Sequence, residues 1–287
     1  MRRPYLFIDV QHGLCNRLRA LASAEALAEQ TDRELVVIWR TDAHCEARIG
    51  DLLDYSGIVI ETDEATAIRQ SCEVEYNYME AEENSCHLAP VFTDDTNERD
   101  RDVYLRSAYS LVSPKLSFDL EQEKLRALRP SGAVLDLIEP IRKLNDIAVH
   151  IRMAGGQGFE HLEYESPKNW PAHRHEELQK WRQQSNREKF ISRIRELENN
   201  NSVNSIFLAA DTPETYAAFA DEFGNKLVTV ERTLYDRSAI QIQYALADLL
   251  MLTTGRYFLG SPWSSFTDVA QRLAGPGRPM DISGLDF

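Results

Sequence analysis

The sequence predicts an α/β protein built on parallel sheets that helices cover on both faces. Short apolar segments such as Tyr5–Val10 and Ile147–Ile151 alternate with segments whose apolar residues recur at helical spacing. Four such strands separated by helices in the second half indicate a parallel, doubly covered sheet. A length of 287 residues indicates about two domains, and 43% hydrophobic with 27% charged residues is typical of a globular protein.

The first half begins with a predicted strand at Tyr5–Val10 and a helix at Asn16–Gln30. Later predicted elements are strands at Leu35–Trp39, Ile58–Ile60 and Val103–Tyr109 and helices at Glu121–Arg129 and Val134–Leu144, the second interrupted by Pro140. Residues 61–102 are acidic and poorly periodic, so no element is predicted there.

A second strand–helix series starts at Ile147–Ile151 and is followed by a polar stretch over residues 153–185. The remaining predicted elements are Asn186–Glu198, Ser205–Ala210, Pro213–Phe223, Leu227–Val230, Ser238–Thr253, Tyr257–Gly260 and Phe266–Leu273. The boundary between the two series is placed just after Pro140, which gives domains 1–145 and 146–287.

The charge pattern disfavours nucleic acid as the main ligand. The chain carries 32 Lys and Arg against 46 Asp and Glu, a net charge of −14, whereas phosphate-backbone binding needs a basic face. Residues 51–102 alone carry 15 acidic and 3 basic side chains. No apolar run approaches the roughly 18 residues of a membrane span, so we expect no transmembrane segment and a cytoplasmic protein.

No metal is expected. The four cysteines form no CxxC pair, which favours reduced thiols, and His173 and His175 lack further ligands at metal spacing. Asp100-Arg101-Asp102 matches the DxD pattern of metal-dependent transferases, but such a match arises easily by chance in so acidic a segment.

Ligands of open parallel sheets bind beyond the carboxyl ends of the strands. After the first strand, Gly13 and Asn16 lead into a helix whose free N–H groups could face an anion. The structural alternative is a tight turn with Asn16 as the helix N-cap.

His150 and Arg152 close the first strand of the second half and share one face, because strand side chains alternate. A guanidinium at a strand end suits a diphosphate through bidentate bonds. The alternatives are a salt-bridged arginine and a satisfied core histidine.

Three later positions join this edge. Asp211 precedes a helix that starts with Pro213, so it is an N-cap or a ligand contact at the same edge. Asp248 lies in an all-apolar helix, where a carboxylate needs a partner: either a guanine ring, which offers two donors, or a neighbouring Arg or loop. Ser264 and Ser265 precede the last helix and serve as caps or as phosphate contacts.

Together these segments resemble a known family. The segments are Gly13-Leu14-Cys15-Asn16-Arg17, Val149-His150-Ile151-Arg152, Phe207-Leu208-Ala209-Ala210-Asp211-Thr212-Pro213, and Ala247-Asp248-Leu249-Leu250 with the later Tyr257-Phe258-Leu259-Gly260-Ser261 and Ser264-Ser265-Phe266. In this order they resemble the GDP-fucose-dependent fucosyltransferases, which include nodulation, core α1,6- and protein O-fucosyltransferases. The resemblance covers the first 20 residues and most of 147–274.

The resemblance implies a GT-B-like fold, two Rossmann-type domains facing across a cleft, with the acceptor on the N-terminal side. It implies inverting, metal-independent transfer of L-fucose or a similar sugar from a GDP-sugar co-substrate. Arg152 would hold the β-phosphate, and His150 and Asp248 the guanine and ribose, with Asp211 nearby. Ser264, Ser265 and Phe266 would line the diphosphate and sugar, and Gly13, Asn16 and Arg17 would close over the donor.

The sequence also departs from the family, since Met153-Ala154-Gly155-Gly156 follows Arg152 where a charged pair is common. Glu160 is the nearest carboxylate after it and is our predicted catalytic base. We expect a glycan, lipid-linked or protein acceptor and a role in polysaccharide biosynthesis. The alternatives are a non-catalytic nucleotide- or glycan-binding relative and a transferase for a different nucleotide sugar.

Overall fold

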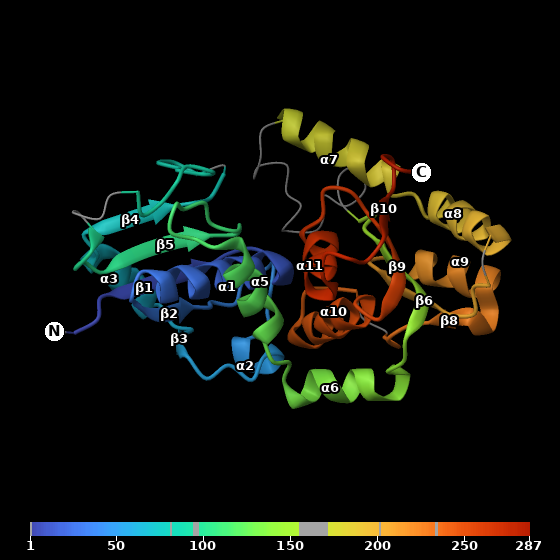
Figure 1. Ribbon diagram of the computed structural model, residues 1–287, viewed down its shortest axis with the longest axis horizontal. Coiled ribbons are helices and arrows are strands. Elements are labelled where there is room, and N and C mark those ends of the chain that lie inside the picture. Colours follow the sequence, from blue (N-terminus) through green and yellow to red (C-terminus); the bar gives the residue numbers. More distant parts are fainter. Residues whose placement is uncertain (1, 81, 94–97, 155–171, 201, 233–234) are drawn as a thin grey trace. The chain divides into compact units, whose positions relative to one another are not determined.

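The computed structural model describes residues 2–80, 82–93, 98–154, 172–200, 202–232 and 235–287 (Figure 1). The chain divides into two compact units, Met1–Ser131 and Gly132–Phe287, each with its own parallel sheet. The predicted α/β class is therefore confirmed.

The sheet of unit 1 has the strand order β3-β2-β1-β5-β4, with all strands parallel. The strands are β1 (Tyr5–Val10), β2 (Glu34–Ile38), β3 (Ile58–Ile60), β4 (Val74–Asn77) and β5 (Val103–Ser107). Helix α3 (Glu64–Ser71) packs its Ala65 and Ile68 against the face that carries Phe7 and Tyr104. Helices α1 (Leu14–Gln30) and α5 (Phe118–Ala127) pack against each other, and α1 also packs against β1.

The sheet of unit 2 has the order β10-β9-β6-β7-β8 and is also parallel throughout. Its strands are β6 (Asn145–Ile151), β7 (Ile206–Ala210), β8 (Leu227–Val228), β9 (Gly255–Gly260) and β10 (Met280–Ile282). Helices α8 (Arg187–Asn200) and α9 (Pro213–Phe223) pack on the face formed by Ile147, Val149 and Ile151. The alternate residues of β6, including His150, point toward α10 (Ala239–Leu252) and α11 (Ser265–Ala274).

Both sheets place their first strand in the middle and build outward in two directions. In unit 2 the chain order reverses between β6 and β9, and in unit 1 it reverses between β1 and β5. Open α/β sheets bind ligands at such reversal points, beyond the carboxyl ends of the strands. The topology thus marks one candidate edge in each unit.

Most predicted elements are present. The strands Tyr5–Val10 and Ile58–Ile60 and the helix Pro213–Phe223 match to the residue. The helix predicted over Val134–Leu144 ends at Ile138 as α6 (Gly132–Ile138), and a 3₁₀ turn over Glu139–Ile141 follows because Pro140 cannot continue an α-helix. Helix α6 packs against α10, so unit 2 begins at Gly132, earlier than the predicted boundary at 145 and 146.

Among the α-helices and strands that the structure describes, five were not predicted: α2 (Ile49–Leu52), α3, β4, α7 (Ala172–Gln184) and β10. The helices α3 and α7 show the reason, since each buries a single residue, Ala65 and Leu178. Their sequences therefore carry little apolar periodicity from which a helix could be predicted. No helix within the described residues is long and apolar enough to cross a membrane.

Candidate functional site

The carboxyl ends of β6 and β9 in unit 2 are tied together by Ser261. Its hydroxyl accepts a hydrogen bond from the Arg152 amide at 2.8 Å and donates to the His150 carbonyl at 3.1 Å. Ser261 is 1% exposed and follows the last residue of β9. The backbone that presents Arg152 is therefore fixed at the reversal point of the sheet.

Arg152 is the first residue after β6, and its guanidinium forms an ion pair with Asp211 at 2.5 Å. Asp211 follows β7 and also accepts the amide hydrogens of Met153 at 3.0 Å and Ala154 at 2.8 Å. Burial acts to raise the pKa of Asp211, but the charge of Arg152 and these hydrogen bonds outweigh it and hold the pKa below its usual value.

The Asp211 carboxylate is thus an ionised anchor for the chain that leaves β6. The N-cap of α9 is Thr212, so the cap interpretation of Asp211 is wrong. Both side chains remain partly exposed, at 17% for Arg152 and 20% for Asp211.

His150 lies on β6, two residues before Arg152, and its imidazole is neutral. Its ring stacks on Phe266 with centroids 4.8 Å apart, and its Nδ1 lies 2.8 Å from the Thr267 hydroxyl. That hydroxyl donates to the Ser261 carbonyl at 2.9 Å, so Nδ1 must be the protonated nitrogen. Burial lowers the pKa of His150 to about 3.

The start of α11 completes this edge. Ser264 is the N-cap, yet its side chain makes no capping hydrogen bond, and Ser265 is the first helical residue. The first amides of a helix lack intrahelical partners and favour an anion. Ser264, Ser265, Phe266 and Arg152 therefore belong to one edge of one sheet, as the sequence predicts.

Asp248 has an arginine partner. Its Oδ1 lies 2.6 Å from the guanidinium of Arg232, and the side chains are 4% and 2% exposed. Burial raises the pKa of Asp248 to about 6, against the opposing pull of Arg232. The rings of Tyr216 and Tyr244 flank this guanidinium, each with its centroid 5.5 Å away. The structure therefore agrees with the interpretation in which Asp248 pairs with a neighbouring arginine.

The predicted residues of unit 1 lie at the β1–α1 turn. Gly13 is the N-cap of α1, so Asn16 is a residue of the helix and the N-cap interpretation of Asn16 is wrong. Arg17 is fully buried, and its guanidinium donates to the carbonyls of His12 at 2.6 Å and Arg40 at 2.7 Å and pairs with Asp42 at 2.9 Å. Arg17 thus fixes the turn from inside the unit, and a buried side chain of this kind does not reach a ligand.

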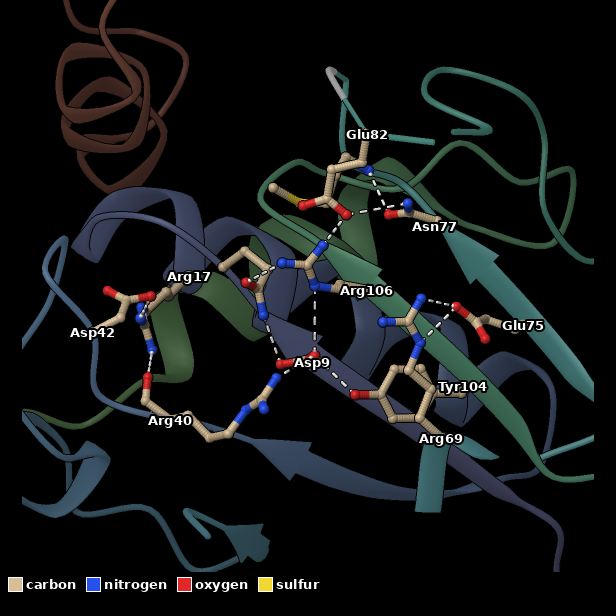
Figure 2. Close-up of polar contacts among 12 residues, drawn as sticks. Asp9, Arg17, Arg40, Asp42, Arg69, Glu75, Asn77, Glu82, Tyr104 and Arg106 are labelled. Carbon is tan, nitrogen blue, oxygen red and sulfur yellow. Dashed lines mark hydrogen bonds and ion pairs between the residues drawn. The ribbon is translucent and has the colours of Figure 1, made fainter. Parts of the chain in front are cut away.

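A second polar cluster lies at the reversal point of unit 1 (Figure 2). Asp9, 1% exposed on β1, accepts hydrogen bonds from Tyr104 at 2.8 Å, Arg40 at 3.1 Å and Gln11 at 2.7 Å. Arg106 lies 3.7 Å from the same carboxylate, donates to Gln11 at 2.9 Å and pairs with Glu82. Arg40 remains 36% exposed and Glu82 38%, so the cluster presents charged groups of both signs to solvent.

Sequence reasoning missed Ser261, Thr267, Arg232 and Asp9. A signal existed for Asp9, a lone acid near the end of an apolar strand. Ser261 and Thr267 look like ordinary turn and helix residues until the strands are paired. Glu160 lies outside the described residues. Among the residues that are described, no group of three or more His, Cys, Asp or Glu side chains is placed to hold a metal ion.

The fold is similar to the folds of several solved structures. NodZ α-1,6-fucosyltransferase soaked with GDP-fucose matches with a TM-score of 0.58 and 16% identity over 95% of this chain and 93% of that one. The fucosyltransferase NodZ from Bradyrhizobium matches with a TM-score of 0.59 at 16% identity, over 94% of this chain and 93% of that one. POFUT1 in complex with GDP-fucose matches with a TM-score of 0.55 and 13% identity over 98% of both chains.

The fold is similar to those of the fucosyltransferases NodZ and POFUT1. The resemblance that the motifs indicate is thereby confirmed at the level of the fold, and so are its two Rossmann-type α/β units. No family model matches the sequence, and no curated protein matches it. The similarity therefore lies in the three-dimensional arrangement, with few identical residues.

Proposed function

We propose that the protein is an inverting, metal-independent glycosyltransferase that moves L-fucose from GDP-fucose to a hydroxyl of a glycan-type acceptor. The observation that carries the proposal is Arg152, held by Asp211 and Ser261 at the reversal point of the unit 2 sheet. The similar folds of NodZ and POFUT1, whose structures contain GDP-fucose, support it.

The chemistry follows from the leaving group. The acceptor oxygen attacks C1 of the sugar from the side opposite the diphosphate, and the bond between C1 and the β-phosphate oxygen breaks. The electron pair of that bond stays on the diphosphate. Arg152 and the free amides at the start of α11 supply preorganised positive potential where this negative charge grows. The proton of the acceptor hydroxyl goes to a base, for which Glu160 is the candidate.

On the nucleotide side, neutral His150 with its unprotonated Nε2 is an acceptor suited to the guanine or ribose. Asp248 lies against Arg232, so its contact with guanine stays a prediction. Asp211 acts in this proposal by orienting Arg152, and Ser264 and Ser265 offer hydroxyls to the diphosphate.

The acceptor is proposed to bind unit 1, at the Asp9 cluster. Within the described part of the chain, the guanidinium of Arg40 donates a hydrogen bond to Asp9, and its side chain is 36% exposed, so further N–H donors can reach a ligand. The charges of Arg40 and Arg106 balance those of Asp9 and Glu82. A site with no net charge suits an uncharged polyol. Arg40→Ala should slow transfer to a neutral oligosaccharide and leave the hydrolysis of GDP-fucose unchanged. Equal slowing of both reactions would contradict an acceptor role.

Two measurements test the function. Calorimetry should show binding of GDP and much weaker binding of UDP and ADP, and the protein should release GDP from GDP-fucose. GDP binding without release would favour the non-catalytic relative, and preference for another nucleotide would favour a different donor. A cytoplasmic location and a role in polysaccharide biosynthesis rest on the sequence alone and stay predictions.

A further inference from the structure

His12 lies two residues beyond β1, in the turn that leads into α1, and its backbone is left-handed with a φ of 64°. A residue with a Cβ adopts this conformation at a cost that glycine does not carry. On one side of the turn, the Gln11 amide donates to the Ser107 carbonyl at 2.9 Å. On the other side, buried Arg17 donates to the His12 carbonyl at 2.6 Å. The fold therefore enforces this conformation, and backbone strain of this kind clusters at functional sites.

The imidazole of His12 is also held in one orientation. Its ring contacts that of His44 in a T-shaped arrangement, with 4.9 Å between the centroids and 76° between the planes. The loop that carries His44 is fixed by Asp42, whose carboxylate accepts the His44 amide hydrogen at 2.9 Å and pairs with Arg17, also at 2.9 Å. Arg17 therefore fixes both the backbone of His12 and the loop against which its ring lies.

Both ring nitrogens of His12 are available to a ligand. Among the described residues no group forms a hydrogen bond with this imidazole, and neither nitrogen is shielded from solvent. Burial, together with His44 and Arg106, lowers the pKa of His12 to about 4, so the ring is neutral at neutral pH. A neutral imidazole carries one N–H donor and one acceptor nitrogen. His12 thus offers one donor and one acceptor in fixed positions, and no other described group uses them.

The ring borders the Asp9 cluster. Gln11, the residue before His12, donates to Asp9 at 2.7 Å and accepts a hydrogen bond from Arg106 at 2.9 Å. Arg106 and its partner Glu82 (Figure 2) both act on His12, since Arg106 lowers its pKa and Glu82 raises it. The imidazole therefore lies at the same carboxyl edge of the unit 1 sheet as these charged side chains.

We propose that His12 binds the acceptor, with its imidazole hydrogen-bonded to a hydroxyl of a neutral sugar. The inference rests on the proposed function, in which the acceptor binds at the Asp9 cluster. A sugar hydroxyl both donates and accepts hydrogen bonds, so it matches the donor and the acceptor of a neutral imidazole. Arginine only donates and a carboxylate only accepts, so His12 adds a recognition element that the charged side chains of the cluster lack.

Steady-state kinetics with GDP-fucose and an array of neutral oligosaccharides tests this role. For the oligosaccharide that the wild type fucosylates fastest, His12→Ala should raise KM about three- to tenfold, the order expected for one lost hydrogen bond, with kcat within about twofold. Hydrolysis of GDP-fucose without an oligosaccharide should be unchanged. An unchanged KM would overturn the assignment, and so would a wild type that hydrolyses GDP-fucose but transfers to none of the oligosaccharides.

Two conservative variants provide a readout that a purely structural role would not move. His12→Asn keeps an amide donor and acceptor near the position of Nδ1, and His12→Gln keeps them near that of Nε2. One of the two should therefore return the oligosaccharide KM to within about twofold of the wild-type value. If both variants behave like His12→Ala, the ring does not bind through a hydrogen bond.

A stability measurement separates binding from folding. His12→Gly relieves the left-handed strain, so its thermal midpoint should be unchanged or higher while the oligosaccharide KM still rises. Asp32→Gly is the matched control, because Asp32 has a φ of 51° but precedes the amino end of β2, and it should leave KM unchanged. A lower midpoint for His12→Gly would mean that His12 is structural. Wild-type protein that releases no GDP from GDP-fucose would instead contradict the proposed function itself.

Discussion

The family resemblance implies a donor contact for both Arg17 and Arg152, but the structure uses the two arginines differently. Arg17 has no exposed surface and holds two carbonyls of its own unit. Arg152 keeps 17% exposure beside a carboxylate that orients it. Sequence identifies the arginine, but its burial depends on strands and loops that pack around it, which no local pattern contains.

At the same scale, His150 should lower the free energy of unfolding of the protein at acidic pH. Its pKa falls from its ordinary 6.5 to about 3 on folding, so below pH 6.5 the unfolded chain binds the extra proton and stability is lost as the pH falls toward 3. The contribution is about 1.4 kcal/mol per pH unit in this window. His12, lowered to about 4 by burial, acts in the same direction, whereas Asp248, raised to about 6, opposes them.

The variant His150→Gln removes the contribution of His150 to this pH dependence. The free energy of unfolding of the wild type minus that of the variant should shrink by about 1.4 kcal/mol per pH unit between pH 6 and 4 in urea titrations. The variant His173→Gln, which removes an exposed imidazole, is the matched control. A difference that stays constant with pH would show that His150 is not neutral in the fold.

At the scale of elements, the Arg232–Asp248 pair fixes the loop before α10 to the helix itself. The apolar helix that contains Asp248 could be predicted from the sequence. The need of its buried carboxylate for a partner could be predicted as well. The identity of that partner could not, because Arg232 lies in a loop with no periodic pattern. For the same reason α7 and β10, with few buried side chains, escaped prediction, whereas strands with continuous apolar runs did not.

Breaking this buried pair should be costly. Arg232→Met leaves the Asp248 carboxylate buried without its cation, and we expect a loss of about 3–5 kcal/mol in the free energy of unfolding. The double variant Arg232→Met/Asp248→Leu should recover much of that loss, because neither charge is then buried. Urea unfolding of the four proteins in the cycle measures this coupling.

The exposed pair Arg195–Glu222 is the matched control for that cycle. Its side chains are 60% and 27% exposed, so Arg195→Met should cost less than about 1 kcal/mol. Additive effects of the two substitutions at Arg232 and Asp248 would contradict a direct ion pair.

At the scale of the whole molecule, the two units repeat one design. Each has a parallel sheet with its first strand in the middle and an arginine–carboxylate contact at the carboxyl ends of its first two strands, Arg152–Asp211 between β6 and β7 and Arg40–Asp9 between β1 and β2. Apolar strands and helical spacing made the two α/β units predictable. The acidic stretch over residues 61–102 concealed α3 and β4, because their charged surfaces outweigh the few residues that pack.

The most direct test of the account is GDP binding by Arg152→Ala, measured by calorimetry. Arg256, 74% exposed at the opposite end of the sheet, supplies the matched control Arg256→Ala. We expect Arg152→Ala to lose at least about tenfold in GDP affinity, the order expected for a charge-assisted contact, while Arg256→Ala binds as the wild type does. Unchanged GDP affinity in a folded Arg152→Ala protein would contradict the assignment of the diphosphate to this edge of unit 2.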